Sequence, residues 1–180
     1  MSSRRATEGP TTNASDQAAA AAMRERAAVS GKATNAEGEG SLLDKVASEA
    51  YRALPGVEFD GGAFDWNSDN TFKYVLMEVD DPDDDGKCRH LVRGLTWAEY
   101  HQESAAPTIE ELEAAGLRWR ILGGGRMKYS AEKKSLHIYG YSYGFPWPNG
   151  VYKHDMRVTD SRDAVVWKNN SINRRRVESD

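Results

Sequence analysis

The stretch 91–101 contains two side chains that could act on an anion, Arg93 and His101. It begins as an apolar strand that carries Arg93, breaks at Gly94, and ends at His101, before an expected helix start at Thr108. Backbone N–H groups at a helix start attract anions, and a histidine titrates near neutral pH. His101 is therefore a candidate catalytic residue, provided that other segments supply an anion site opposite it.

Glycine-bearing segments could supply such a site, although none is specific when taken alone. They comprise residues 93–94, 123–126 and 139–144. The triple glycine within 123–126 lacks the spacing of a P-loop and opens no helix, so a turn between strands is expected there. The pattern Gly-x-Ser-x-Gly around Ser142 is that of a nucleophile elbow, but only His154 follows it, and the chain is too short for an α/β-hydrolase fold. A serine hydrolase is therefore not favoured.

Metal-binding motifs in the sequence are incomplete. Residues 81–86 match the opening of a calcium loop, but its twelfth position is Val92 instead of glutamate, and its flanks are expected strands. A solvated hairpin tip is expected there. Cys88 is the only cysteine, which excludes an internal disulfide and a cysteine-based zinc cluster. His90 and His137 lack the short spacing of a histidine metal site, so no metal and no cofactor is expected.

Composition argues against nucleic-acid and membrane partners. The 180 residues have a formal net charge of −4, and the short basic cluster 174–176 is expected to be a solvated tail. No apolar run approaches the ~18 residues of a membrane span. A lone cysteine fits a reducing compartment, so the sequence predicts a cytoplasmic protein. A monomer that binds neither nucleic acid nor membrane is expected.

Apolar periodicity predicts the elements that must position these residues. Helices are expected over residues 42–54, 108–116 and 149–156, the second opening with a capping box between Thr108 and Glu111. Strands are expected over residues 57–60, 72–79, 90–93, 117–122, 126–130, 135–140 and 164–167. This order predicts an α/β (mixed α+β) single domain, with a mixed, mostly antiparallel sheet of about six strands flanked by helices.

The two ends of the chain are expected to lie outside this domain. Residues 1–40 contain no aromatic residue, Leu or Ile, so they cannot bury enough apolar surface to offset their chain entropy. A helix in the alanine-rich part, residues 17–28, would be marginal in isolation. Disorder is therefore expected for residues 1–41 and 173–180, and the domain is expected to span residues 42–172.

Five sequence blocks form a combination that is more specific than any one of them. They are Phe-Lys-Tyr-Val-Leu (72–76), Val-Arg-Gly (92–94), Trp-Ala-Glu-Tyr-His (97–101), Leu-Gly-Gly-Gly-Arg (122–126) and His-Ile-Tyr-Gly-Tyr-Ser (137–142). In this combination the chain closely resembles the protein-histidine phosphatases of the Janus/Ocnus family, over residues 54–167.

The resemblance implies a metal-independent hydrolase that removes phosphate from phosphohistidine, and in some members phospholysine, on proteins. His101 matches the catalytic histidine, which acts as general base on water or as transient phosphoryl acceptor. Phosphohistidine-containing proteins are then the expected partners. The residues expected to bind the phosphate are Lys73, Arg93, Gln102, Arg126, Ser142, Tyr143 and Gly144.

Two departures from the family pattern affect these expectations. Gln102 stands where the family carries alanine, and residues 143–148 replace the usual Met-Ala-Tyr-Gly-Pro. A cradle of backbone N–H groups would tolerate both changes, although substrate access is expected to differ. The alternative is a non-catalytic, phosphate-binding regulatory module of the same fold, which a turnover assay would distinguish.

Overall fold

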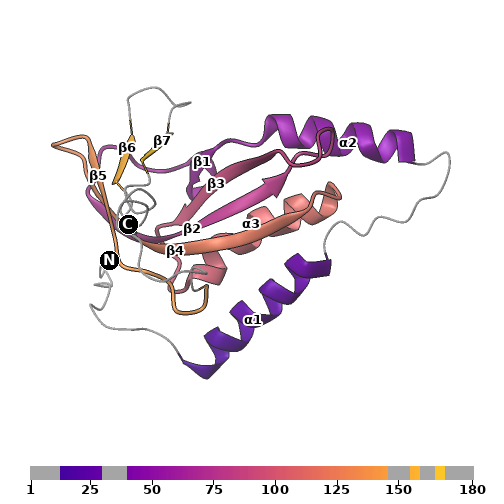
Figure 1. The fold of residues 1–180 in the computed structure, drawn as a ribbon. Coiled ribbons are helices and arrows are strands. Elements are labelled where there is room, and N and C mark those ends of the chain that lie inside the picture. The colour runs from indigo at the N-terminus through magenta and orange to yellow at the C-terminus, as the bar shows by residue number, and fades with distance from the viewer. Residues whose placement is uncertain (1–12, 30–39, 146–154, 159–164, 169–180) are drawn as a thin grey trace, which may run out of the picture.

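The computed structural model describes residues 13–29, 40–145, 155–158 and 165–168 of the chain. They contain an open sheet of five strands in the order β1-β3-β2-β4-β5 (Figure 1). These strands are β1 (Val57–Phe59), β2 (Asn70–Asp80), β3 (Cys88–Leu95), β4 (Trp119–Ser130) and β5 (Ser135–Tyr139). β1 runs parallel to β3, whereas the other neighbouring strands are antiparallel. The prediction of a mixed, mostly antiparallel sheet in a single domain is confirmed.

Helices accompany this sheet, as the sequence predicts. They are α1 (Ala14–Val29), α2 (Gly40–Ala53) and α3 (His101–Ala114), with a 3-10 turn at η1 (Asp60–Gly62). α3 lies along one face of the sheet against β2 and β3, and α1 contacts α3 and β4 (Figure 1). None of the helices in the described part of the chain is long and apolar enough to cross a membrane.

A separate two-stranded ribbon lies near the C-terminus, formed by β6 (Asp155–Val158) and β7 (Val165–Lys168). β7 corresponds to the strand predicted over residues 164–167. The helix predicted over residues 149–156 is wrong at its end, because Asp155 already begins β6. Residues 149–154 lie outside the described residues.

α3 begins at His101, well before the start predicted at Thr108. The Glu103 carboxylate accepts the backbone N–H groups of Glu99 at 2.6 Å and Tyr100 at 2.8 Å, which satisfies donors at the helix start. Thr108 is buried inside the helix. The predicted capping box is therefore wrong, and the histidine itself occupies the first helical position.

The triple glycine, residues 123–125, lies inside β4 and not in the predicted turn. It pairs with β2 next to a register shift at which β4 carries an extra residue. A Cβ atom on Gly124 would lie 2.5 Å from the backbone oxygen of Tyr74, and one on Gly125 would lie 2.9 Å from that of Tyr139. The glycines therefore permit a close approach of neighbouring strands, which a larger residue would prevent.

Apolar side chains cover both faces of the sheet. On one face, Val75 and Met77 of β2 pack with Ile109 and Leu112 of α3, all fully buried. The opposite face carries a mainly aromatic cluster that includes Phe59, Phe64, Phe72, Tyr74 and Tyr129. Because successive side chains of a strand alternate between faces, Lys73 shares the α3 face with Val75. This face is where the candidate site lies.

α1 falls within residues 1–41, for which the composition predicts disorder. Ala20 of this helix is 1% exposed and belongs to the core cluster that includes α3. Arg26 forms a two-pronged contact with Glu113 of α3, with N–O distances of 3.2 and 2.5 Å. The composition argument applies to an isolated helix, whereas packing against α3 and β4 supplies the stability that the isolated helix lacks. The outer limits of the domain stay a prediction.

Candidate functional site

His101 lies at the start of α3 with its ring against β4. Its Nε2 atom is 3.0 Å from the backbone oxygen of Gly125. Because a carbonyl oxygen can only accept, Nε2 donates the proton in this contact, and Nδ1 of the neutral ring keeps its lone pair. The site therefore holds a histidine with one nitrogen fixed and the other available as a base or nucleophile.

The environment of His101 favours its neutral form. Burial is the main cause that lowers the pKa of His101, to about 4, and the nearby charges of Lys73 and Arg126 act in the same direction. The contact with the Gly125 oxygen opposes them, because that acceptor stabilises a protonated ring. The imidazole is therefore neutral throughout the physiological range, as both general-base and nucleophilic roles require.

Two cationic side chains lie beside this histidine. Lys73 of β2 and Arg126 of β4 are directly opposite each other in the sheet. The ammonium group of Lys73 donates to the backbone oxygen of Glu99 and lies 5.2 Å from the centre of the Tyr100 ring. Burial, followed by the charge of Arg126, lowers the pKa of Lys73. The two positive charges repel each other in a partly desolvated site, and a bound anion would reduce this repulsion.

Ser142 approaches His101 from the segment after β5. A Cβ atom placed on Gly124 would lie 2.9 Å from Cδ2 of His101 and 3.5 Å from Cβ of Ser142. Gly124 thus lies between the two side chains, and its missing side chain leaves room for both. The Ser142 hydroxyl accepts the backbone N–H of Phe145 at 3.2 Å, and Ser142 is 2% exposed. Its hydroxyl proton remains a possible donor to a ligand.

Tyr143 and Gly144, which the resemblance also implicates, continue this segment. The Tyr143 side chain is exposed, and its hydroxyl accepts a hydrogen bond from that of Tyr141 at 2.7 Å. The backbone oxygen of Gly144 accepts from Arg24 of α1. The Tyr143 side chain therefore faces solvent and Gly144 anchors the segment to α1, and their part in phosphate binding stays a prediction.

Gln102 also faces α1. Its amide nitrogen donates to the Asp16 carboxylate over a long distance of 3.4 Å. The charge of Asp16 is among those that raise the pKa of Lys73 against the larger effect of burial, so α1 brings a carboxylate toward the cationic site. The composition of residues 1–41 carries no signal for this contact, because it depends on tertiary packing.

Arg93 is buried between β3 and α3. It is 4% exposed, and its guanidinium donates to the Thr108 hydroxyl at 3.0 Å and to the backbone oxygens of Val92 and Pro55, both at 2.9 Å. These contacts join β3 to α3 and to the segment before β1. Arg93 therefore supports the helix that carries His101, and the phosphate contact that the resemblance implies stays a prediction.

Among the described residues, the side chains with clustered metal-ligand atoms are Glu78, Cys88 and His90, which lie elsewhere in the sheet. The site around His101 contains the cations Lys73 and Arg126, the Ser142 hydroxyl, a neutral imidazole and backbone groups, and the carboxylates of Asp16, Glu99 and Glu103 act on the charge of Lys73. The cations and the hydroxyl suit an anion.

Comparison with known proteins identifies related sequences. Residues 63–156 match the sequence profile of the Janus/Ocnus family (Ocnus). The chain is similar to the 14 kDa phosphohistidine phosphatase of Sus scrofa, with 38% identity over 96 residues, which is 51% of this chain and 71% of that protein. The corresponding Homo sapiens protein is 31% identical over 121 residues, 64% of this chain and 91% of that protein.

The sex-regulated protein janus-A of Drosophila melanogaster is 34% identical over 104 residues, covering 58% of this chain and 70% of that protein. The matched region 63–156 contains His101, Lys73, Arg126 and Ser142, the residues that the fold brings together. By the extent of this match, the chain belongs to the Janus/Ocnus family.

Proposed function

We propose that this chain is a protein-histidine phosphatase that hydrolyses the P–N bond of phosphohistidine in proteins. The observation that carries the proposal is the neutral His101, fixed through Nε2 to the Gly125 oxygen beside two cationic side chains. The names of the Sus scrofa and Homo sapiens relatives support the same substrate class. Phospholysine has the same type of P–N bond, so it is a second substrate to test.

In the proposed reaction, Lys73 and Arg126 neutralise the phosphoryl oxygens, and the Ser142 hydroxyl donates to one of them. Phosphoryl transfer depends mainly on positioning and charge stabilisation, and these groups provide both without requiring a metal ion. The substrate imidazole must carry a proton when the P–N bond breaks, because a neutral imidazole is a better leaving group than its anion. Solvent supplies this proton at the ring nitrogen that does not bear the phosphoryl group.

Nδ1 of His101 can serve in either of two ways. As general base it takes a proton from water while the water oxygen bonds to phosphorus and the P–N bond breaks. As nucleophile it bonds to phosphorus itself, and water hydrolyses the phosphohistidine formed at His101 in a second step. Both routes end with inorganic phosphate and the unmodified substrate histidine. Both routes use the lone pair on Nδ1 of His101, so the geometry is compatible with either mechanism.

A turnover assay tests the proposal. The purified chain is expected to release phosphate catalytically from a phosphohistidine-containing protein, and to do so equally well with EDTA present. A matched reaction without the chain corrects for spontaneous hydrolysis. Phosphate binding without turnover would contradict the proposal and support a non-catalytic binding module. Turnover that EDTA abolishes would instead contradict metal independence.

The pH dependence of the reaction is expected to follow the low pKa of His101. Protonation removes the Nδ1 lone pair, so activity should fall only as the pH approaches about 4. An unperturbed histidine would give an acid limb near ~6.5. The measurement is kcat/KM against pH, which reports the free enzyme, with spontaneous hydrolysis subtracted at each pH. An acid limb near ~6.5 would contradict a desolvated catalytic histidine.

A further inference from the structure

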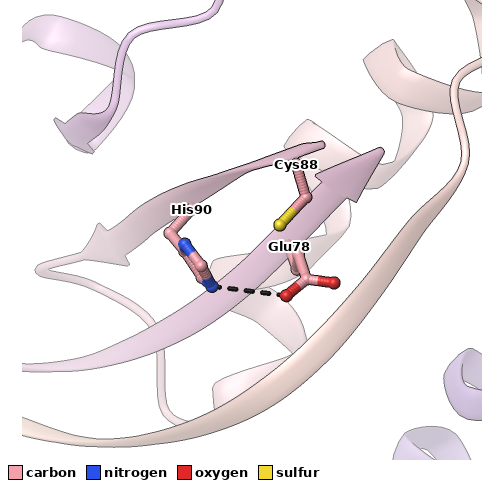
Figure 2. Close-up of side chains that lie close together, drawn as sticks. All are labelled: Glu78, Cys88 and His90. Atoms are coloured by element: carbon pink, nitrogen blue, oxygen red, sulfur yellow. Dashed lines mark ion pairs between the residues drawn. The ribbon is translucent and has the colours of Figure 1, made fainter. Parts of the chain in front are cut away.

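A second group of reactive side chains lies on the face of the sheet opposite to α3. Glu78 of β2 and His90 of β3 are directly opposite each other, and Cys88 projects from the same face of β3 as His90. Figure 2 shows the thiol, imidazole and carboxylate turned toward one another. The ligand atoms of the three residues all lie within 4.8 Å of one another. This convergence comes from strand pairing, so motif spacing along the sequence did not reveal it.

We propose that Glu78, Cys88 and His90 bind a Zn²⁺ ion. Thiolate, imidazole and carboxylate are all common zinc ligands, and three of them leave one tetrahedral position for water. With bond lengths of about 2.0–2.3 Å, neighbouring ligands around tetrahedral zinc lie about 3.3–3.8 Å apart. His90 Nε2 and Glu78 Oε2 are already 3.3 Å apart. Residue spacing along the chain predicts no metal site here, whereas the pairing of β2 with β3 brings the three ligands together.

The surroundings of Glu78 keep one carboxylate oxygen available. Arg120 pairs with Oε1, whereas Oε2 faces His90. Glu78 is 7% exposed, so its orientation is fixed by packing and by Arg120. A metal ion can therefore bind Oε2 while Arg120 stays paired with Oε1. The Arg120 contact then orients the Glu78 carboxylate from outside the metal site.

The charges around the cluster decide how binding depends on pH. A thiolate and the Glu78 carboxylate together match the double charge of Zn²⁺, while Arg120 and Arg118 oppose the ion. Arg118 is itself paired with Asp80 at 3.2 Å. Zinc binds the thiolate form of Cys88, so the thiol proton leaves for the buffer as the ion binds.

The site would join β2 to β3 and take no part in the hydrolysis. Lys73 lies further along β2 on the opposite face, about 17 Å from Glu78 at ~3.4 Å per residue. Zinc bound here is expected to raise the melting temperature by mass action, because it stabilises the paired hairpin and not the unfolded chain. Phosphatase activity is expected to be the same with and without zinc.

The test is a Zn²⁺ titration of the full chain after removal of metal, in competition with a chromophoric chelator. One equivalent is expected to bind, with release of a thiol proton and a rise in melting temperature. Co²⁺ in place of Zn²⁺ should give a thiolate-to-metal charge-transfer band. Cys88→Ser and His90→Ala should each weaken zinc binding by at least about tenfold. Even substitution of a residue that only hydrogen-bonds to a metal ligand typically lowers metal affinity by about 10–100-fold.

His137→Ala is the matched control, because His137 is also an exposed strand histidine. It should bind zinc like the parent chain. Cys88 and His90 are exposed, so their variants are expected to fold, and the melting temperature without zinc checks this. Absence of binding, or binding that survives both Cys88→Ser and His90→Ala unchanged, would overturn the proposed site.

Discussion

His101→Ala is expected to abolish release of phosphate from a phosphohistidine protein while the chain remains folded. The substitution removes the Nδ1 lone pair on which both proposed routes depend. Loss of a general base alone typically costs about 10²–10⁴-fold in rate. His101 begins α3, and its ring bonds to the Gly125 oxygen of β4 and not to the backbone of its own helix. Removal of the ring is therefore expected to leave the helix and its Glu103 cap in place. The measurements are kcat and the melting temperature.

The matched control for this variant is again His137→Ala, at an exposed strand position in β5. It should retain full activity, because the ring of His137 stacks on Tyr139 and contributes nothing to the proposed chemistry. Full activity in His101→Ala would exclude His101 from catalysis. Brief incubation with radiolabelled substrate then separates the two routes, since only the nucleophilic route leaves label on His101.

The general architecture could be predicted from sequence because it depends on local patterns. The aromatic and β-branched run in β2, the hairpin loop 81–86 and the strand after it form the antiparallel pair that the pattern indicates. The residue blocks around Lys73, His101, Arg126 and Ser142 identified the family, and the fold brings these four together. Each block is a short local segment, and the combination of blocks is specific to the family.

The remaining features depend on contacts that sequence periodicity does not encode. Thr108 fits the pattern of a helix cap, yet it is buried, because the Glu103 carboxylate caps the helix earlier. Arg93 resembles an anion ligand in sequence, yet its donors are used by Thr108 and by two backbone oxygens. α1 is marginal alone and becomes stable through packing of Ala20 and the Arg26 contact. The start of α3 was mispredicted because tertiary structure decided between local alternatives, whereas the phosphate contact of Arg93 stays a prediction.

Gly124→Ala is expected to destabilise the chain and to displace His101, the proposed catalytic residue. The new Cβ would lie 2.5 Å from the Tyr74 backbone oxygen and 2.9 Å from His101 Cδ2. Backbone of the neighbouring strand cannot move without disturbing the sheet, so the clash is relieved partly by moving His101. Overpacking costs about 1–3 kcal/mol in stability. A displacement of about 1 Å at the reacting groups can cost about 10²-fold in rate.

Two glycine controls separate these effects, with stability measured by urea denaturation and kcat measured where each variant is folded. Gly56→Ala should change neither, because a Cβ there would have nothing within 4 Å. Gly94→Ala should lower stability through a contact of 2.7 Å with the Phe72 ring, which lies on the face opposite to His101. It should therefore retain most of its kcat. If Gly124→Ala and Gly94→Ala lose the same stability and the same kcat, then Gly124 is needed only for packing of the sheet. A larger loss of kcat in Gly124→Ala would show that close strand packing also sets the position of His101.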